Sequence, residues 1–93
     1  MINSIFKQRI KIEHEFIKNF CENIGVLVYN KDGKMNFNIV EELKEKGYEI
    51  TIVNNHILIN DLNINKYFVY ELKTEYLKED GKYIAKMYYE LKE

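Results

Sequence analysis

Apolar residues in the first part of the chain recur with a helical period. At about 100° per residue they cover roughly half of a helix circumference. Asn3 or Ser4 can supply the N-cap oxygen, and Gly25 follows the last apolar residue as a stop signal. The pattern predicts a helix over residues 4–24 whose stripe is wide enough to lie in a curved sheet or to meet a second subunit. Its members are Ile2, Ile5, Phe6, Ile10, Ile12, Phe16, Ile17, Phe20, Cys21 and Ile24.

Alternating apolar and polar positions predict three β-hairpins farther along the chain. Their two-residue turns are placed at Asp32-Gly33, Asn54-Asn55 and Asp80-Gly81. A two-residue turn fixes which residues face each other, and each choice brings apolar residues to one face. A three-residue loop over residues 79–81 is also compatible with the sequence but matches the faces less well. The expected pairs include Val28 with Phe37, Tyr29 with Asn36, Ile52 with Ile57, Leu72 with Tyr89 and Glu71 with Glu90.

A short helix is predicted over residues 39–46, between the first two hairpins. Asn38 is its expected N-cap, acidic residues fill its first turn, and Gly47 ends it. The predicted order is α-β-β-α-β-β-β-β, an α+β fold in which two helices pack on an antiparallel sheet. Helices and strands do not alternate regularly, which argues against a parallel sheet. The whole chain, residues 1–93, is expected to form one domain.

Composition narrows the classes of function. Hydrophobic residues make up 46% and charged residues 31% of the 93 residues, with a net charge of −1. Acidic and basic residues are balanced along the chain, and no basic block marks a phosphate-binding surface. No apolar run approaches the ~20 residues that span a bilayer, and no signal peptide is recognised at the N-terminus. A cytoplasmic location is therefore expected, and the single cysteine fits a reducing compartment.

Residues for familiar catalysis are scarce. The lone Ser4 lies at the predicted helix cap, and Cys21 lies on the apolar stripe, where a buried structural thiol is expected. His14 and His56 are not spaced as metal ligands. The glycines are accounted for by turns and helix ends, and none forms a phosphate-binding loop. We therefore expect neither an enzyme, a metal site nor a cofactor.

Glu71 and Glu90 are the one carboxylate pair that could serve acid–base chemistry. They face each other in the predicted last hairpin, and a close pair of carboxylates can raise one pKa. A small nuclease using both carboxylates and a lysine is one interpretation. The more ordinary interpretation is two solvated side chains flanked by Lys73 and Lys92.

Arg9 and Glu13 stand near the middle of the apolar stripe, one helical turn apart. They could form an intrahelical ion pair at a partly covered edge of the helix. They could also be a polar anchor in an interface with a partner. The sequence leaves both open.

Tyrosines give the strongest signal of binding. The last hairpin holds six of the eight, and its register sends Tyr70, Tyr76, Tyr83 and Tyr89 to the apolar side. Tyr88 is expected on the opposite side, with Tyr67 and Tyr29 as further candidates. Exposed tyrosines are frequent hot spots in protein interfaces, and they can also stack on unpaired bases. A composition with 13 Ile, 13 Lys and 11 Asn indicates AT-rich coding, which by itself raises the number of tyrosines.

The element order and the aromatic closing segments, residues 66–72 and 86–91, resemble small virus-encoded anti-CRISPR proteins, in particular type I-D inhibitors of archaeal rod-shaped viruses. The resemblance implies a non-enzymatic, dimeric inhibitor that occupies a surface of a CRISPR effector, and it assigns no functional residue. We expect a binding protein with a protein partner and a homodimer. The alternative is a single-stranded nucleic-acid binder. The candidate partner-binding residues are Tyr67, Tyr88, Tyr29, Arg9 and Glu13.

Overall fold

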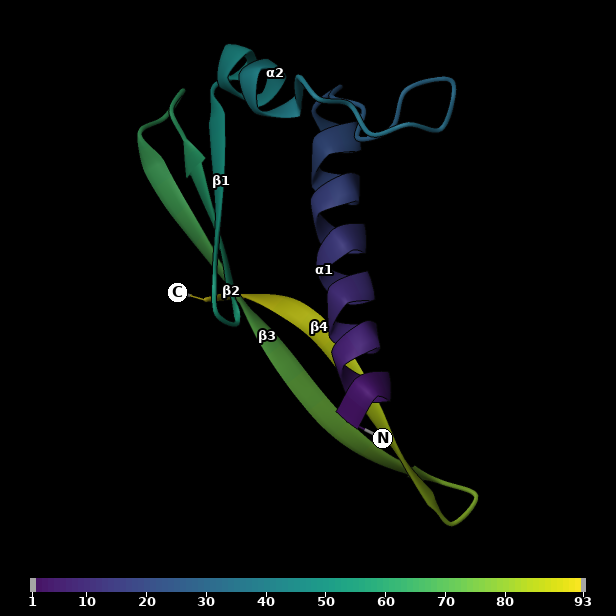
Figure 1. Ribbon diagram of the computed structural model, residues 1–93. Coiled ribbons are helices and arrows are strands. Elements are labelled where there is room, and N and C mark those ends of the chain that lie inside the picture. The colour runs from purple at the N-terminus through teal and green to yellow at the C-terminus, as the bar shows by residue number, and fades with distance from the viewer. Residues whose placement is uncertain (1, 93) are drawn as a thin grey trace.

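The computed structural model describes the backbone of residues 2–92 and the side chains of residues 7–92. Four antiparallel strands form one sheet in the order β1-β2-β3-β4. Helix α1 lies along one face of this twisted sheet, and the β3–β4 hairpin extends past the N-terminal end of α1 (Figure 1). The predicted α+β class is confirmed. The elements are α1 (Ile2–Asn23), α2 (Ile39–Lys46), β1 (Tyr48–Val53), β2 (His56–Asp61), β3 (Lys66–Glu79) and β4 (Lys82–Lys92).

The C-terminal end of helix α1 agrees with the prediction, whereas its N-terminal end does not. It starts at Ile2, so Asn3 and Ser4 lie inside the helix instead of at its cap. At the other end Gly25 has a φ of 84°. The Val26 amide donates to the Cys21 carbonyl at 2.8 Å, which closes the helix as a Schellman motif. Among the described residues, no helix is long and apolar enough to cross a membrane.

The first predicted hairpin is wrong as a pair of strands. Residues 25–38 form a loop with a single bridge between Tyr29 and Met35, one position away from the expected Tyr29–Asn36 pair. The cause is a three-residue loop: the Asn30 amide donates to the Lys34 carbonyl at 2.8 Å, and Gly33 takes the left-handed conformation. The observed element order is therefore α-α-β-β-β-β.

Asn36 turns this loop into α2. Its side-chain Nδ2 donates to the Leu27 carbonyl and the Glu42 carboxylate, and its side-chain Oδ1 accepts from the main-chain amide of Asn38. Asn38 is the N-cap by position, but it makes no capping bond with its own side chain. Helix α2 itself is confirmed over Ile39–Lys46, and Gly47 ends it with a φ of 91°.

The other two hairpins have the predicted registers. In β1–β2, Ile52 pairs with Ile57. The chain turns at Asn54, which has a φ of 52°. In β3–β4 all of the predicted pairs occur, including Leu72 with Tyr89 and Glu71 with Glu90. Positive φ angles at Asp80 and Gly81 identify a type I′ turn.

The core lies between the C-terminal half of α1, α2 and the β1–β2 side of the sheet. Ile57 and Cys21 are fully buried, which confirms the structural role expected for the thiol, and burial raises its pKa. Phe20 packs edge-on against Tyr48 at 5.4 Å between ring centroids. Farther along the helix, Phe16 packs against aromatic rings of β3 and β4. The buried apolar residues are Cys21, Val26, Val28, Leu43, Ile57, Ile59 and Met87.

Candidate functional site

The end of the β3–β4 hairpin carries large apolar side chains that the body of the protein does not cover. We call Tyr76, Leu77, Tyr83 and Ile84 the hairpin tip. Tyr76 and Tyr83 are 70% and 73% exposed, and Leu77 and Ile84 are 48% and 47% exposed. Leu77 pairs with Ile84 on one face, while the two tyrosines lie on the opposite face. The tip therefore presents apolar surface on both sides of a two-stranded ribbon.

The lengths of the elements explain this exposure. Strand β3 has 14 residues and α1 has 22. At about 3.3 Å per strand residue and 1.5 Å per helix residue, β3 is roughly 46 Å long and α1 roughly 33 Å. The helix therefore cannot cover the whole hairpin, and the hairpin projects beyond it (Figure 1). A contact of α1 near the tip runs from Gln8 Nε2 to the Ala85 carbonyl at 3.0 Å.

Four tyrosines of this hairpin were predicted to share the apolar side, and the register confirms the shared face. Their surroundings differ. Phe16 packs against Tyr70 and Tyr89, with centroid distances of 4.8 and 5.2 Å. Tyr76 and Tyr83 remain exposed. Because the alternation of the sequence assigns Tyr76 and Tyr83 to the apolar side, they are absent from the predicted site residues, and only their exposure in the structure marks them.

The predicted residues Tyr67 and Tyr88 share the outer face of the sheet but do not form one patch. Tyr67 is the second residue of β3 and is 65% exposed. Tyr88 pairs with Lys73, six residues farther along the strand or about 20 Å away. Its hydroxyl donates to the Glu75 carboxylate at 2.8 Å, and this bond raises the pKa of Tyr88.

Tyr29 lies in the loop after α1 and is 38% exposed. Its hydroxyl is 2.9 Å from His14 Nε2, and the two rings are tilted at 5.6 Å. The contact fastens the loop to the polar edge of α1. Tyr29 therefore does not join the tyrosines of the sheet.

Arg9 and Glu13 form no ion pair within the described part of the chain. Instead Arg9 Nη2 donates to the Asn54 carbonyl at 2.7 Å and ties α1 to the β1–β2 turn. Both charges act on Tyr89, whose pKa is raised first by burial, then by Glu13, with Arg9 opposing. The Tyr89 hydroxyl is buried without a hydrogen-bond partner among the described residues.

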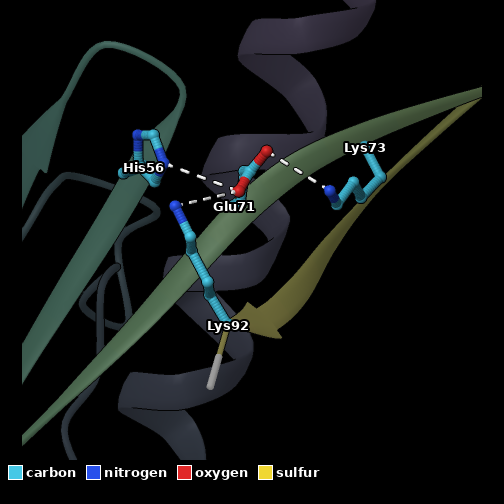
Figure 2. Close-up of polar contacts among 4 residues, drawn as sticks. All are labelled: His56, Glu71, Lys73 and Lys92. Atoms are coloured by element: carbon cyan, nitrogen blue, oxygen red, sulfur yellow. Dashed lines mark hydrogen bonds and ion pairs between the residues drawn. The ribbon is translucent and has the colours of Figure 1, made fainter.

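Glu71 is the centre of a polar cluster on the outer face (Figure 2). Lys73 Nζ lies 3.3 Å from Oε1, while Lys92 Nζ and His56 Nε2 lie 3.6 and 3.8 Å from Oε2. The hydrogen bond and charge of Lys73 lower the pKa of Glu71, with smaller contributions from Lys92 and His56. Glu90 faces Glu71 across the strands, as predicted.

This cluster favours a structural role over acid–base chemistry. A general acid near neutral pH needs a raised carboxyl pKa, and the pKa of Glu71 is lowered. The cluster joins β2, β3 and β4 through one carboxylate. No group of three or more His, Cys, Asp or Glu side chains among the described residues is arranged to hold a metal ion.

The hairpin tip thus brings four exposed apolar side chains together at the end of the sheet, and none of the predicted site residues belongs to it. Comparison with protein-family models, curated proteins and solved structures gives no match to this chain.

Proposed function

We propose that the protein is a non-enzymatic binding module that presents the hairpin tip to a partner protein. The observation that carries the proposal is the exposure of Tyr76 and Tyr83, at 70% and 73%, on a ribbon that projects beyond α1. Leu77 and Ile84 add half-exposed apolar surface on the reverse side. A ribbon that is apolar on both faces fits a groove better than a flat surface.

Tyrosine suits this role physically. It offers a large contact area and a hydroxyl, and ordering it costs little entropy because it has only two side-chain torsions. The tip is also held in shape by the type I′ turn at Asp80-Gly81 and by the continuous ladder of β3 and β4. A preordered hairpin loses little further conformational freedom on binding.

A protein partner fits the charges of the tip better than a nucleic acid does. Lys78 and Lys82 flank Glu79 and Asp80 at the turn. Glu75 stands opposite Lys86 below it. Phosphate binding needs clustered basic side chains, whereas interleaved charges form the polar rim that usually surrounds the apolar centre of a protein interface.

The resemblance to anti-CRISPR proteins makes a CRISPR effector complex the first partner to test. We expect the purified protein to bind a type I-D effector complex in a biolayer binding assay. Expression of the protein should restore plaques of a targeted phage or virus on a host with that system. Replacing Tyr76 and Tyr83 together by Ser should weaken binding at least ~30-fold, because the loss of even one interface hot spot costs about 2 kcal/mol or more.

The matched control is Tyr67→Ser, which removes a tyrosine of similar exposure far from the tip. It should bind as the unchanged protein does. Equal binding by the tip double variant would exclude the tip as the binding surface. Absence of both binding and plaque restoration by the unchanged protein would exclude the type I-D effector as partner.

A further inference from the structure

The outer edge of β4 carries main-chain groups that no strand pairs within the described residues. The two-residue turn makes Glu79–Lys82 a hydrogen-bonded pair, so even-numbered residues of β4 point their main-chain groups toward β3. The amides and carbonyls of Met87, Tyr89 and Leu91 therefore point outward. The bond from Gln8 to the Ala85 carbonyl agrees with this assignment, since Ala85 belongs to the outward set.

An unpaired strand edge is a template for another strand. Gln8 covers the carbonyl of Ala85, but no hydrogen bond of the described residues uses the outward groups of Met87 or Tyr89. On the inner face at this level, the Phe16 ring packs against Tyr70 of β3 and Tyr89 of β4. On the outer face, Lys86 and Glu90 are exposed on either side of Tyr88.

We infer that two copies of the chain pair antiparallel through their β4 edges, with the two-fold axis at Tyr88. Met87 of each copy then exchanges main-chain hydrogen bonds with Tyr89 of the other copy. Tyr88 lies directly opposite Tyr88 of the second copy. Lys86 lies opposite Glu90 of the second copy on both sides of the axis, and the two sheets become one.

The charges along β4 select this register. Outer-face residues of the strand are Lys82, Ile84, Lys86, Tyr88, Glu90 and Lys92. A two-fold axis at Lys86 or at Glu90 would place each of these charges opposite itself. An axis at Met87 would oppose Lys82 to Lys92, and one at Tyr89 would oppose Lys86 to Lys92. Two like charges that face each other across strands destabilise a sheet, and a positive charge facing a negative one stabilises it. Among these registers, only the one with its axis at Tyr88 forms favourable charge pairs and no unfavourable ones.

This pairing is independent of the proposed function. It uses residues 86–90, and it leaves Tyr76, Leu77 and Tyr83 uncovered at opposite ends of the joined sheet. The dimer would carry two hairpin tips, which would strengthen binding to a partner with two sites.

The first test is sedimentation equilibrium of the full chain over a concentration series. We expect a mass of twice 11.3 kDa that dissociates on dilution. Lys86→Glu and Glu90→Lys should each raise the dissociation constant at least tenfold, because each creates two like-charged pairs across the axis. The double exchange, Lys86→Glu with Glu90→Lys, should restore the dimer. Lys82→Glu is the control, since it reverses the same charge outside residues 86–90.

The second test uses oxidative cross-linking at the axis. Tyr88 is a non-hydrogen-bonded pair with itself, where Cα atoms are about 4.5 Å apart, within reach of a disulfide. Tyr88→Cys should cross-link into a dimer, whereas Lys82→Cys should not, and the native Cys21 is buried. A monomer at every concentration without a Tyr88→Cys cross-link overturns the inference. So does a dimer that neither charge reversal weakens, or that the double exchange fails to restore.

Discussion

Phe16 joins α1 to the two longest strands, and its removal should reveal how the hairpin is held. Its ring lies 4.8 Å from that of Tyr70 on β3 and 5.2 Å from that of Tyr89 on β4. Phe16→Ala would delete both aromatic contacts and leave a space between helix and sheet. The strands would keep their ladder, but the helix would lose its main hold on this part of the sheet.

The expected cost follows from burial. A fully buried Phe→Ala change costs about 3–5 kcal/mol, and each aromatic pair contributes about 0.5–1.5 kcal/mol of that. Phe16 is only half-buried, so we expect a loss of about 2–3 kcal/mol. A domain of 93 residues has an unfolding free energy of roughly 5–14 kcal/mol, and the change would remove a large part of it.

Urea denaturation followed by circular dichroism at one protein concentration measures this loss. The control is Phe37→Ala, because Phe37 is 93% exposed and its removal should change stability by less than about 0.5 kcal/mol. Equal stability changes for the two variants would refute the assignment of Phe16 as the contact between α1 and the hairpin.

Two further outcomes follow from local geometry. Gly47→Ala should destabilise by more than the ~1–2 kcal/mol that a left-handed residue costs, because a Cβ at Gly47 would displace the Asn63 side chain, whose amide nitrogen donates a hydrogen bond to the Lys46 carbonyl. Gly33→Ala, with a φ of 78° and open space around it, should cost only the conformational part; equal losses in thermal melts would exclude the overlap. Lys73 lowers the folded-state pKa of Glu71. The ionised Glu71 carboxylate therefore stabilises the fold at a pH above its unfolded-state pKa of about 4.3, and this stabilisation is lost as the pH falls through its folded-state pKa. The difference in unfolding free energy between the unchanged protein and Glu71→Gln should therefore vanish in acid, and a difference that persists there would contradict the ionic origin.

The sequence by itself determined the parts of the fold that local rules govern. Both long hairpins have the predicted register, because Asn54-Asn55 and Asp80-Gly81 fix the turns and a slip of one residue would exchange the faces. Helix α2 was equally readable from its acidic first turn and from Gly47. The burial of Cys21 followed from the helical period of its apolar neighbours.

Only the tertiary structure decided which surfaces are covered. The first hairpin differs from the prediction because its turn is a three-residue loop, closed by the bond from the Asn30 amide to the Lys34 carbonyl, and only the Tyr29–Met35 bridge forms beside it. Tyr70 and Tyr76 share a strand and a face, yet Phe16 packs on Tyr70, whereas Tyr76, six residues or about 20 Å farther along β3, stays 70% exposed. Period-two alternation assigns a side chain to a face, whereas its exposure depends on where another element ends in space. That distinction separates the predicted tyrosine candidates from the hairpin tip.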